Sequence, residues 1–134
     1  MKILHVSPLY SPSIGGNQLH IQLMSEKLAQ LGEQVHVFTS YAIYTSHFRA
    51  PDGSLNNLPF KEIINGVPVE RFKINYRFIN FVLQRKSKMR GVYRLFKALT
   101  AKTFEFWTHG PVAWGMLGAI RRLKPDIVLV TNHY

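Results

Sequence analysis

The sequence predicts an α/β fold with a mainly parallel sheet and helices on both of its faces. Within the first 40 residues, a strand pattern, a glycine-bearing loop, a helix pattern and a second strand pattern follow one another, which is typical of a βαβ unit. Further along, residues 127–130 form an unbroken apolar run, typical of a parallel strand that is buried on both faces. A length of 134 residues suits one domain of this class.

The opening βαβ unit has clear boundaries. Residues 2–7 alternate and are rich in β-forming side chains, so they predict a strand, and residues 34–40 predict a second one. Between them, prolines and paired glycines indicate a loop, after which residues 17–31 predict a helix. Gly32 then stands just beyond the helix end, a position that favours glycine. The apolar residues at helical spacing are Leu19, Leu23, Met24, Leu28 and Leu31.

The middle of the chain mixes turn signals with a short strand pattern. Residues 41–59 contain several Pro, Asp, Gly, Ser and Asn residues, so they predict a long surface loop. Asn65 and Gly66 lie between apolar flanks, which predicts a tight hairpin turn, and the alternation from Val67 onward predicts the strand that follows it.

The last third of the chain predicts two helices and a strand. Apolar residues at helical spacing predict a helix over 92–107, and a second helix over 112–123 ends in basic residues that suit a helix C-terminus. The strand at 127–130 is followed by only four residues, whereas a helix usually covers such a strand in an open α/β sheet. We therefore expect residues 1–134 to be the leading part of a larger domain.

Positive charge is concentrated in one stretch of the chain. The 17 Lys and Arg residues outnumber the 7 Asp and Glu residues, and the net charge is +10. Ten of these cations lie between residues 71 and 102, where no acidic residue occurs. A field of one sign implies an anionic partner, such as a membrane surface, a phosphorylated substrate or a nucleic acid. The ten cations are Arg71, Lys73, Arg77, Arg85, Lys86, Lys88, Arg90, Arg94, Lys97 and Lys102.

Aromatic residues are interleaved with these cations, a composition that suits contact with the acceptor of a reaction or with an anionic membrane surface. The alternative is a solvated positive face above an apolar core. The sequence contains no nucleic-acid-binding motif, so we expect no nucleic-acid partner. The candidate contact residues are Arg85, Lys86, Lys88, Arg90 and Arg94.

Cysteine is absent, which excludes disulfides, thiolate nucleophiles and cysteine-based metal sites. No apolar run approaches the ~18 residues that span a bilayer, and the first residues lack the longer apolar region of a secretory signal. These features predict a cytoplasmic protein, which would be peripheral at the inner membrane face if the basic stretch binds lipid.

The clearest chemical signal is the pair Gly15 and Gly16 between the first strand and its helix. Without side chains there, a ligand can approach the backbone, and the N–H groups of the first helical turn, which includes Asn17, favour an anion. A phosphate or diphosphate is the natural ligand. The motif is neither Gly-x-Gly-x-x-Gly nor a P-loop, and the alternative is that the two glycines only form a tight turn.

Four stretches, in order along the chain, carry a family resemblance. They are residues 1–16 (MKILHVSPLYSPSIGG), 23–40, 64–71 (INGVPVER) and 123–128 (LKPDIV). Together they closely resemble the N-terminal domain of GT-B-fold glycosyltransferases, specifically the large family 4 group. The resemblance implies a Rossmann-like domain on the acceptor side of a retaining enzyme. Such an enzyme moves a sugar from a nucleoside diphosphate-sugar to an acceptor, which is lipid-linked or a cell-envelope polysaccharide.

The resemblance also implies roles for residues of the glycine loop. Gly15, Gly16 and Asn17 would approach the donor diphosphate when two domains close, and the N–H groups would stabilise charge on the leaving group. Gln18 stands where many relatives have Glu, so it is a secondary candidate. Neither a metal nor another cofactor is implied, because the nucleotide-sugar is itself a substrate.

A catalytic residue is harder to assign. Many relatives end the last of these strands with a His that contacts the sugar; Thr131 matches that place directly, and His133 is the candidate two residues later. The donor nucleotide binds mainly in a C-terminal domain that 134 residues do not accommodate, so we expect the chain alone to be inactive. The alternative function is a non-catalytic domain that binds a partner subunit or an anionic membrane surface.

Overall fold

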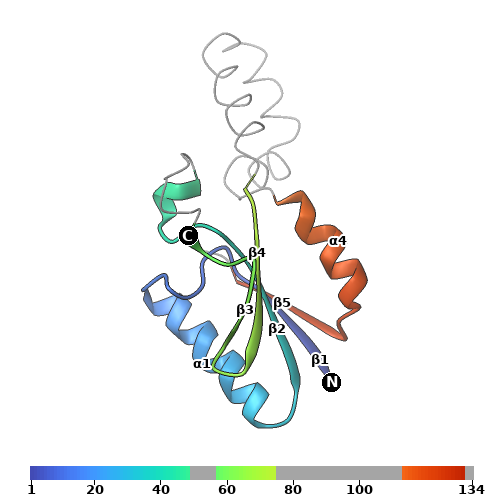
Figure 1. Cartoon of the computed structure of the whole chain (residues 1–134). Coiled ribbons are helices and arrows are strands. Elements are labelled where there is room, and N and C mark those ends of the chain that lie inside the picture. Colours follow the sequence, from blue (N-terminus) through green and yellow to red (C-terminus); the bar gives the residue numbers. More distant parts are fainter. Residues whose placement is uncertain (49–56, 75–112, 132–134) are drawn as a thin grey trace, which may run out of the picture.

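The computed structural model describes residues 1–48, 57–74 and 113–131. They form an α/β fold with one five-stranded, mostly parallel sheet and two α-helices (Figure 1). In chain order the elements are β1 (Lys2–Val6), α1 (Gly16–Gln30), β2 (Gln34–Ser40), the 3₁₀ turn η1 (Thr45–Phe48), β3 (Lys61–Ile64), β4 (Val67–Phe72), α4 (Trp114–Leu123) and β5 (Ile127–Val130).

The strand order is β3-β4-β2-β1-β5, and the last four of these strands are parallel. Strand β1 lies in the middle of the parallel set, where Ile3 pairs with Val35 of β2 and with Ile127 of β5. Strand β3 is antiparallel to β4. The sequence-based prediction of a mainly parallel sheet is therefore confirmed, with one antiparallel strand at its edge.

The turn between β3 and β4 is the tight hairpin that the sequence predicts. Asn65 and Gly66 have φ values of 49° and 85°, so both adopt the left-handed conformation that two-residue hairpins require. The Asn65 side chain also donates a hydrogen bond of 2.7 Å to Glu26 of α1, which fastens the turn to the helix. Asn and Gly at these two positions thus fix where β3 ends and β4 begins.

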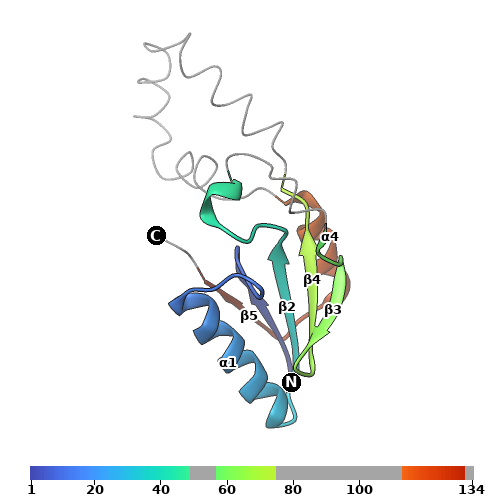
Figure 2. The same ribbon diagram turned by 60° about the vertical axis from the view of Figure 1, so that its left-hand side comes forward.

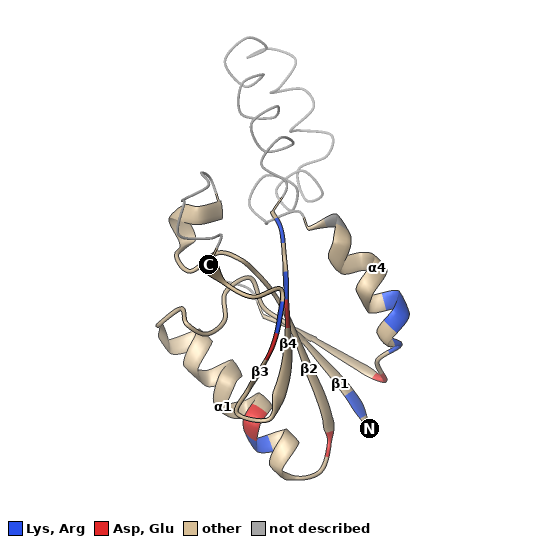
Figure 3. Cartoon of the chain, viewed as in Figure 1, with Lys and Arg blue, Asp and Glu red and all other residues tan. Residues whose placement is uncertain are grey.

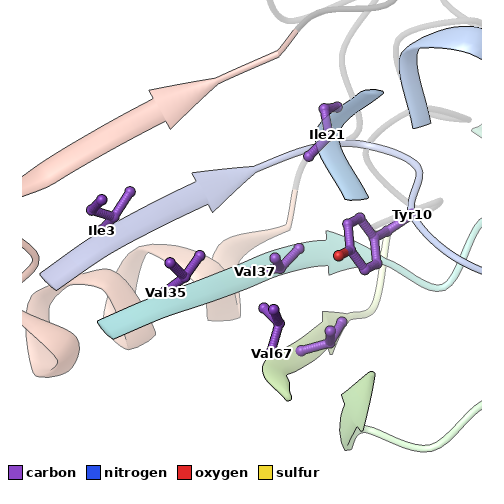
Figure 4. Close-up of a cluster of buried hydrophobic side chains, with 7 residues drawn as sticks. Ile3, Tyr10, Ile21, Val35, Val37 and Val67 are labelled. Carbon is purple, nitrogen blue, oxygen red and sulfur yellow. The ribbon is translucent and has the colours of Figure 1, made fainter. Parts of the chain in front are cut away.

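Helix α1 covers one face of the sheet and α4 covers the other (Figures 1 and 2). The core beneath α1 joins the helix residue Ile21 to side chains of β1, β2 and β4, as Figure 4 shows. The core beneath α4 joins Ala119 to Leu4, Phe38 and Phe72. The residues of the first core are Ile3, Tyr10, Ile21, Val35, Val37, Val67 and Val69.

Helix α1 ends as the sequence predicts, but its buried face differs from the apolar pattern that indicated it. Gly32 follows the helix with φ 89°, and its N–H donates to the carbonyl of Ala29 at 3.0 Å. In contrast, Leu19 and Leu23 are 57% and 55% exposed. The buried face of α1 carries Gln18, Ile21 and Ser25. The apolar spacing therefore predicted the helix correctly without identifying the face that packs.

Helix α4 begins two residues later than predicted and ends at Leu123, as predicted. Lys124 closes it with φ 48°, and its N–H donates to the carbonyl of Ile120 at 3.1 Å. Arg121 and Arg122 lie in the last turn, where the helix dipole favours cations, and Figure 3 shows this basic end. No helix in the described part of the chain is long and apolar enough to span a bilayer.

Strand β5 forms where predicted, but the expectation that both of its faces are buried is wrong for the described residues. Ile127, Val128, Leu129 and Val130 are 38%, 43%, 37% and 71% exposed. Strand β5 lies at the edge of the sheet, whereas the two cores beneath the helices are built on β1, β2 and β4.

The predicted surface loop after β2 is more ordered at its start than its composition suggests. The η1 turn buries His47, and the ring nitrogen Nδ1 of His47 accepts the N–H of Ile43 at 3.2 Å. Ala42 is buried as well, against Leu9 and Ile74. Residues 49–56 of this loop and the helix predicted over 92–107 lie outside the described residues.

Candidate functional site

The glycine loop, residues 7–15, leaves β1 at the carboxyl edge of the sheet and returns to the start of α1. Hydrogen bonds fasten its beginning to β2: the Ser7 N–H donates to the carbonyl of Phe38 at 3.0 Å, and the Ser40 hydroxyl donates to the carbonyl of Pro8 at 2.7 Å. Within the loop, the Ser13 N–H donates to the carbonyl of Tyr10 at 2.9 Å. The loop is therefore held at both its base and its turn.

Apolar burial separates a fixed side of this loop from an exposed tip. Leu9 and Tyr10 are each only 2% exposed, whereas Ile14 is 99% exposed. The two buried side chains anchor the first half of the loop in the core beside α1 and beside Ala42. The tip and the two glycines that follow it consequently stand at the edge of the fold.

Gly15 and Gly16 have different surroundings. Gly15 has φ 177°, an extended conformation that any residue can adopt, so its dihedral angles do not demand glycine. A β-carbon at Gly15 would instead collide with the side-chain amide of Gln18. A β-carbon at Gly16 would meet no atom of the described residues within 4 Å. The space beside Gly16 is therefore open to a molecule from outside.

Gln18, the secondary candidate, folds back over Gly15. Its side chain is part of the buried face of α1, and the residue is 8% exposed. A β-carbon at Gly15 would require the end of the Gln18 side chain to move away. Because Gln18 is neutral, it brings no negative charge to the first turn of the helix.

The first turn of α1 is electrostatically suited to an anion. It contains no acidic residue, and its N-cap residue is Gly15, which makes no side-chain capping hydrogen bond. The first helical hydrogen bond runs from the N–H of Leu19 to the carbonyl of Gly15 at 3.0 Å, so the amides of Gly16, Asn17 and Gln18 precede the helical ladder. A helix of this length carries about half a positive elementary charge at its N-terminus.

A buried polar cluster lies behind the loop, between β1 and α1. The Ser25 hydroxyl donates to the carbonyl of Ile21 at 2.7 Å and lies 2.5 Å from Nδ1 of His5. Because the single hydroxyl hydrogen is used by Ile21, we assign the proton of the His5 ring to Nδ1, which donates to Ser25. Burial lowers the pKa of His5, so the ring is neutral near pH 7.

Tyr10 completes this cluster. Burial raises the pKa of its hydroxyl to about 12, an effect that the neighbouring Ser25 hydroxyl partly offsets. His5, Ser25 and Tyr10 are each at most 2% exposed, so they support the loop from within. His5 is thus a core histidine, whereas His20 lies exposed on α1.

We predict that His5 makes the fold less stable in acid. Because its folded pKa lies below the ordinary value of 6.5, the unfolded chain takes up this proton first as the pH falls. The contribution of His5 to the free energy of unfolding is complete above pH 6.5 and is lost as the pH falls from there toward the folded pKa.

Urea unfolding of the wild type and of His5→Phe, from about pH 7.5 to about pH 5.5, measures this contribution. The wild type should lose more stability in that interval than His5→Phe does. His20→Gln, at an exposed position, serves as the control and should follow the wild type. Parallel curves for the wild type and His5→Phe would contradict the prediction.

Sequence reasoning treated Arg71 only as one cation among ten, but it is a structural part of this site. Its guanidinium is 1% exposed and reaches the carbonyl of Ser11, in the glycine loop, at 2.6 Å. The available signal was a charged residue, Arg71, at an inner position of a strand whose residues Val69 and Phe72 are apolar. The remaining sequence candidates, His133 and the basic residues Arg85, Lys86, Lys88, Arg90 and Arg94, lie outside the described residues.

No family model, no curated protein and no solved structure matches this chain. Within residues 1–48, 57–74 and 113–131, no group of three or more His, Asp or Glu side chains is placed to hold a metal ion. The described site presents backbone amides at the N-terminus of α1.

Proposed function

We propose that this chain is the acceptor-side, N-terminal Rossmann-like part of a retaining GT-B-type glycosyltransferase. The observation that carries the proposal is the glycine loop at the carboxyl edge of β1, which leads into a helix that has Gly15 at its N-cap and no acidic residue in its first turn. In open α/β sheets, ligands bind at this edge. The resemblance of four stretches to family 4 enzymes supplies the reaction class.

In the proposed reaction, Gly15, Gly16 and Asn17 face the diphosphate of the nucleotide-sugar. When the bond between the sugar and the diphosphate breaks, negative charge builds on the leaving diphosphate. Amide dipoles that are already oriented toward that charge lower the barrier, since they need no rearrangement during the reaction. Because Gln18 is neutral, it does not offset the positive electrostatic potential of these amides. The nucleotide itself would be held mainly by a second domain, and the acceptor by this one.

The open space beside Gly16 provides a test. We predict that Gly16→Ala keeps or raises the stability of the chain, because the added methyl group meets no atom of the described residues and alanine favours a helix over glycine by up to about 1 kcal/mol. The same methyl group should raise the dissociation constant for inorganic pyrophosphate about tenfold, because it keeps the anion away from the backbone.

Isothermal titration calorimetry with pyrophosphate measures the second effect. Gly118→Ala is the matched control, because Gly118 is a helical glycine of α4 with no atom closer than 3.9 Å to the position of an added β-carbon. It should leave pyrophosphate binding at the wild-type level. Equal affinities for Gly16→Ala and Gly118→Ala would count against a phosphate site at Gly16.

A further inference from the structure

Arg71 places a buried positive charge at the point where three segments of the chain meet. It lies near the carboxyl end of β4, beside Thr39 of β2 in the sheet register. The residue is 1% exposed, and its guanidinium is directed toward the segment before β3 and toward the glycine loop. A guanidinium without water is costly unless its N–H groups are paired.

Both terminal nitrogens of the guanidinium have partners. Nη1 forms an ion pair with the carboxylate of Glu62 in β3 and donates to the carbonyl of Pro59 at 3.2 Å. Nη2 donates to the carbonyl of Ser11 at 2.6 Å. The backbone N–H of Arg71 also donates to the carbonyl of Phe60 at 2.8 Å. One side chain thus links β4, the segment that enters β3, and the glycine loop.

The bond to Ser11 is the one that bears on the site. Ser11 is 60 residues from Arg71 in the sequence and four residues before Gly15. It belongs to the turn that the hydrogen bond between Ser13 and Tyr10 closes. A charged donor at 2.6 Å is among the stronger hydrogen bonds in proteins, so it restrains the carbonyl side of this turn.

We propose that Arg71 is a positioning residue that holds the glycine loop at the carboxyl edge of the sheet. Its planar fork is suited to this task, because it binds the Glu62 carboxylate and two carbonyls in different directions at once. Lysine offers a single ammonium group and cannot span the same three oxygens. Arg71 acts through the loop, so its link to phosphate binding rests on the proposed function, whereas its effect on loop order does not.

Amide hydrogen exchange of the 134-residue chain, followed by NMR, tests this proposal. In Arg71→Met, the exchange of the Ser13 amide should accelerate about tenfold or more relative to the wild type, because the turn loses its anchor. The amide of Val37, in the middle of β2, should accelerate much less. If Arg71 contributed only to global stability, the substitution would accelerate both amides by the same factor. The ratio of the acceleration at Ser13 to that at Val37 therefore distinguishes loop positioning from global stability.

Lys61→Met is the matched control. It removes the same charge from the neighbouring strand, where Lys61 forms a 2.7 Å exposed ion pair with Glu70 and does not contact the loop. Its Ser13 exchange should change less than about twofold. If Arg71→Met fails to fold, Arg71→Lys, which retains the charge beside Glu62, should still show the selective acceleration at Ser13. The proposal would be overturned if, in the variant that folds, the exchange rate of the Ser13 amide were unchanged or the Val37 amide accelerated by the same factor.

A pyrophosphate titration of the same samples separates this inference from the proposed function. If the wild type binds pyrophosphate, and if this binding weakens about tenfold in Arg71→Met but not in Lys61→Met, the result supports both the proposed function and the positioning role of Arg71. If the wild type does not bind pyrophosphate at the glycine loop, the proposed function fails, and the exchange ratio alone decides the role of Arg71.

Discussion

Leu4→Ala should lower the free energy of unfolding by about 3 kcal/mol, the largest effect expected of any single substitution considered for this chain. Leu4 lies on β1 in the middle of the parallel strands and is 0% exposed. It packs with Phe38 and Phe72, whose rings meet edge to face at 5.1 Å between centroids, and with Ala119 of α4. Two aromatic rings already in contact cannot readily move into the vacated space, so a cavity should remain.

Urea unfolding followed by circular dichroism measures this loss. The matched control is Leu23→Ala on the outer side of α1, where the side chain is 55% exposed and the cost should stay below about 1 kcal/mol. A Leu4→Ala variant as stable as Leu23→Ala would show that the interface between α4 and the sheet is not packed as described.

Ser25→Ala should lower the free energy of unfolding by about 2 kcal/mol, although alanine is a better helix former than serine. Ser25 is fully buried, and its hydroxyl oxygen accepts the hydrogen bond from Nδ1 of His5. Nε2 of His5 has no hydrogen-bond partner among the described residues. Removing the Ser25 hydroxyl therefore leaves both ring nitrogens of His5 without a partner among these residues. An unpaired buried donor is more expensive than the hydrogen bond that it replaces.

The double variant His5→Phe/Ser25→Ala shows whether this explanation is correct. With both polar partners removed, most of the loss should be recovered, since an apolar pair leaves no unsatisfied group. Ser46→Ala, at an exposed position of η1, controls for the loss of a hydroxyl and should change stability by less than about 0.5 kcal/mol. Additive losses from the two single substitutions would contradict the proposed hydrogen bond.

The elements of the fold were predictable where local chemistry determines them. The left-handed pair Asn65 and Gly66, and Gly32 after α1, act through their own backbone preferences, so single residues were sufficient evidence. The exposure of β5 was not predictable, because an apolar strand looks the same whether or not a helix covers it. The packing face of α1 was equally hidden, since it carries the polar residues Gln18 and Ser25, and the partner of Ser25 is His5 of β1, 20 residues away in the sequence.

The candidate site was predictable in its position but not in its supports. Paired glycines between a strand and a helix indicate the loop directly. The contact of Gln18 with Gly15 depends on a side-chain rotamer, and the bond of Arg71 to Ser11 joins residues that are far apart in the sequence. Such contacts follow from the tertiary arrangement of β4 beside the loop, which no local pattern encodes.

An NMR titration of the ¹⁵N-labelled wild-type chain with inorganic pyrophosphate tests directly whether the glycine loop binds phosphate. We expect saturable shifts that are largest for the backbone amides of Gly15, Gly16 and Asn17, at the N-terminus of α1. Shifts that are absent there, or that are confined to amides distant from the glycine loop, would contradict a phosphate site and the glycosyltransferase function built on it.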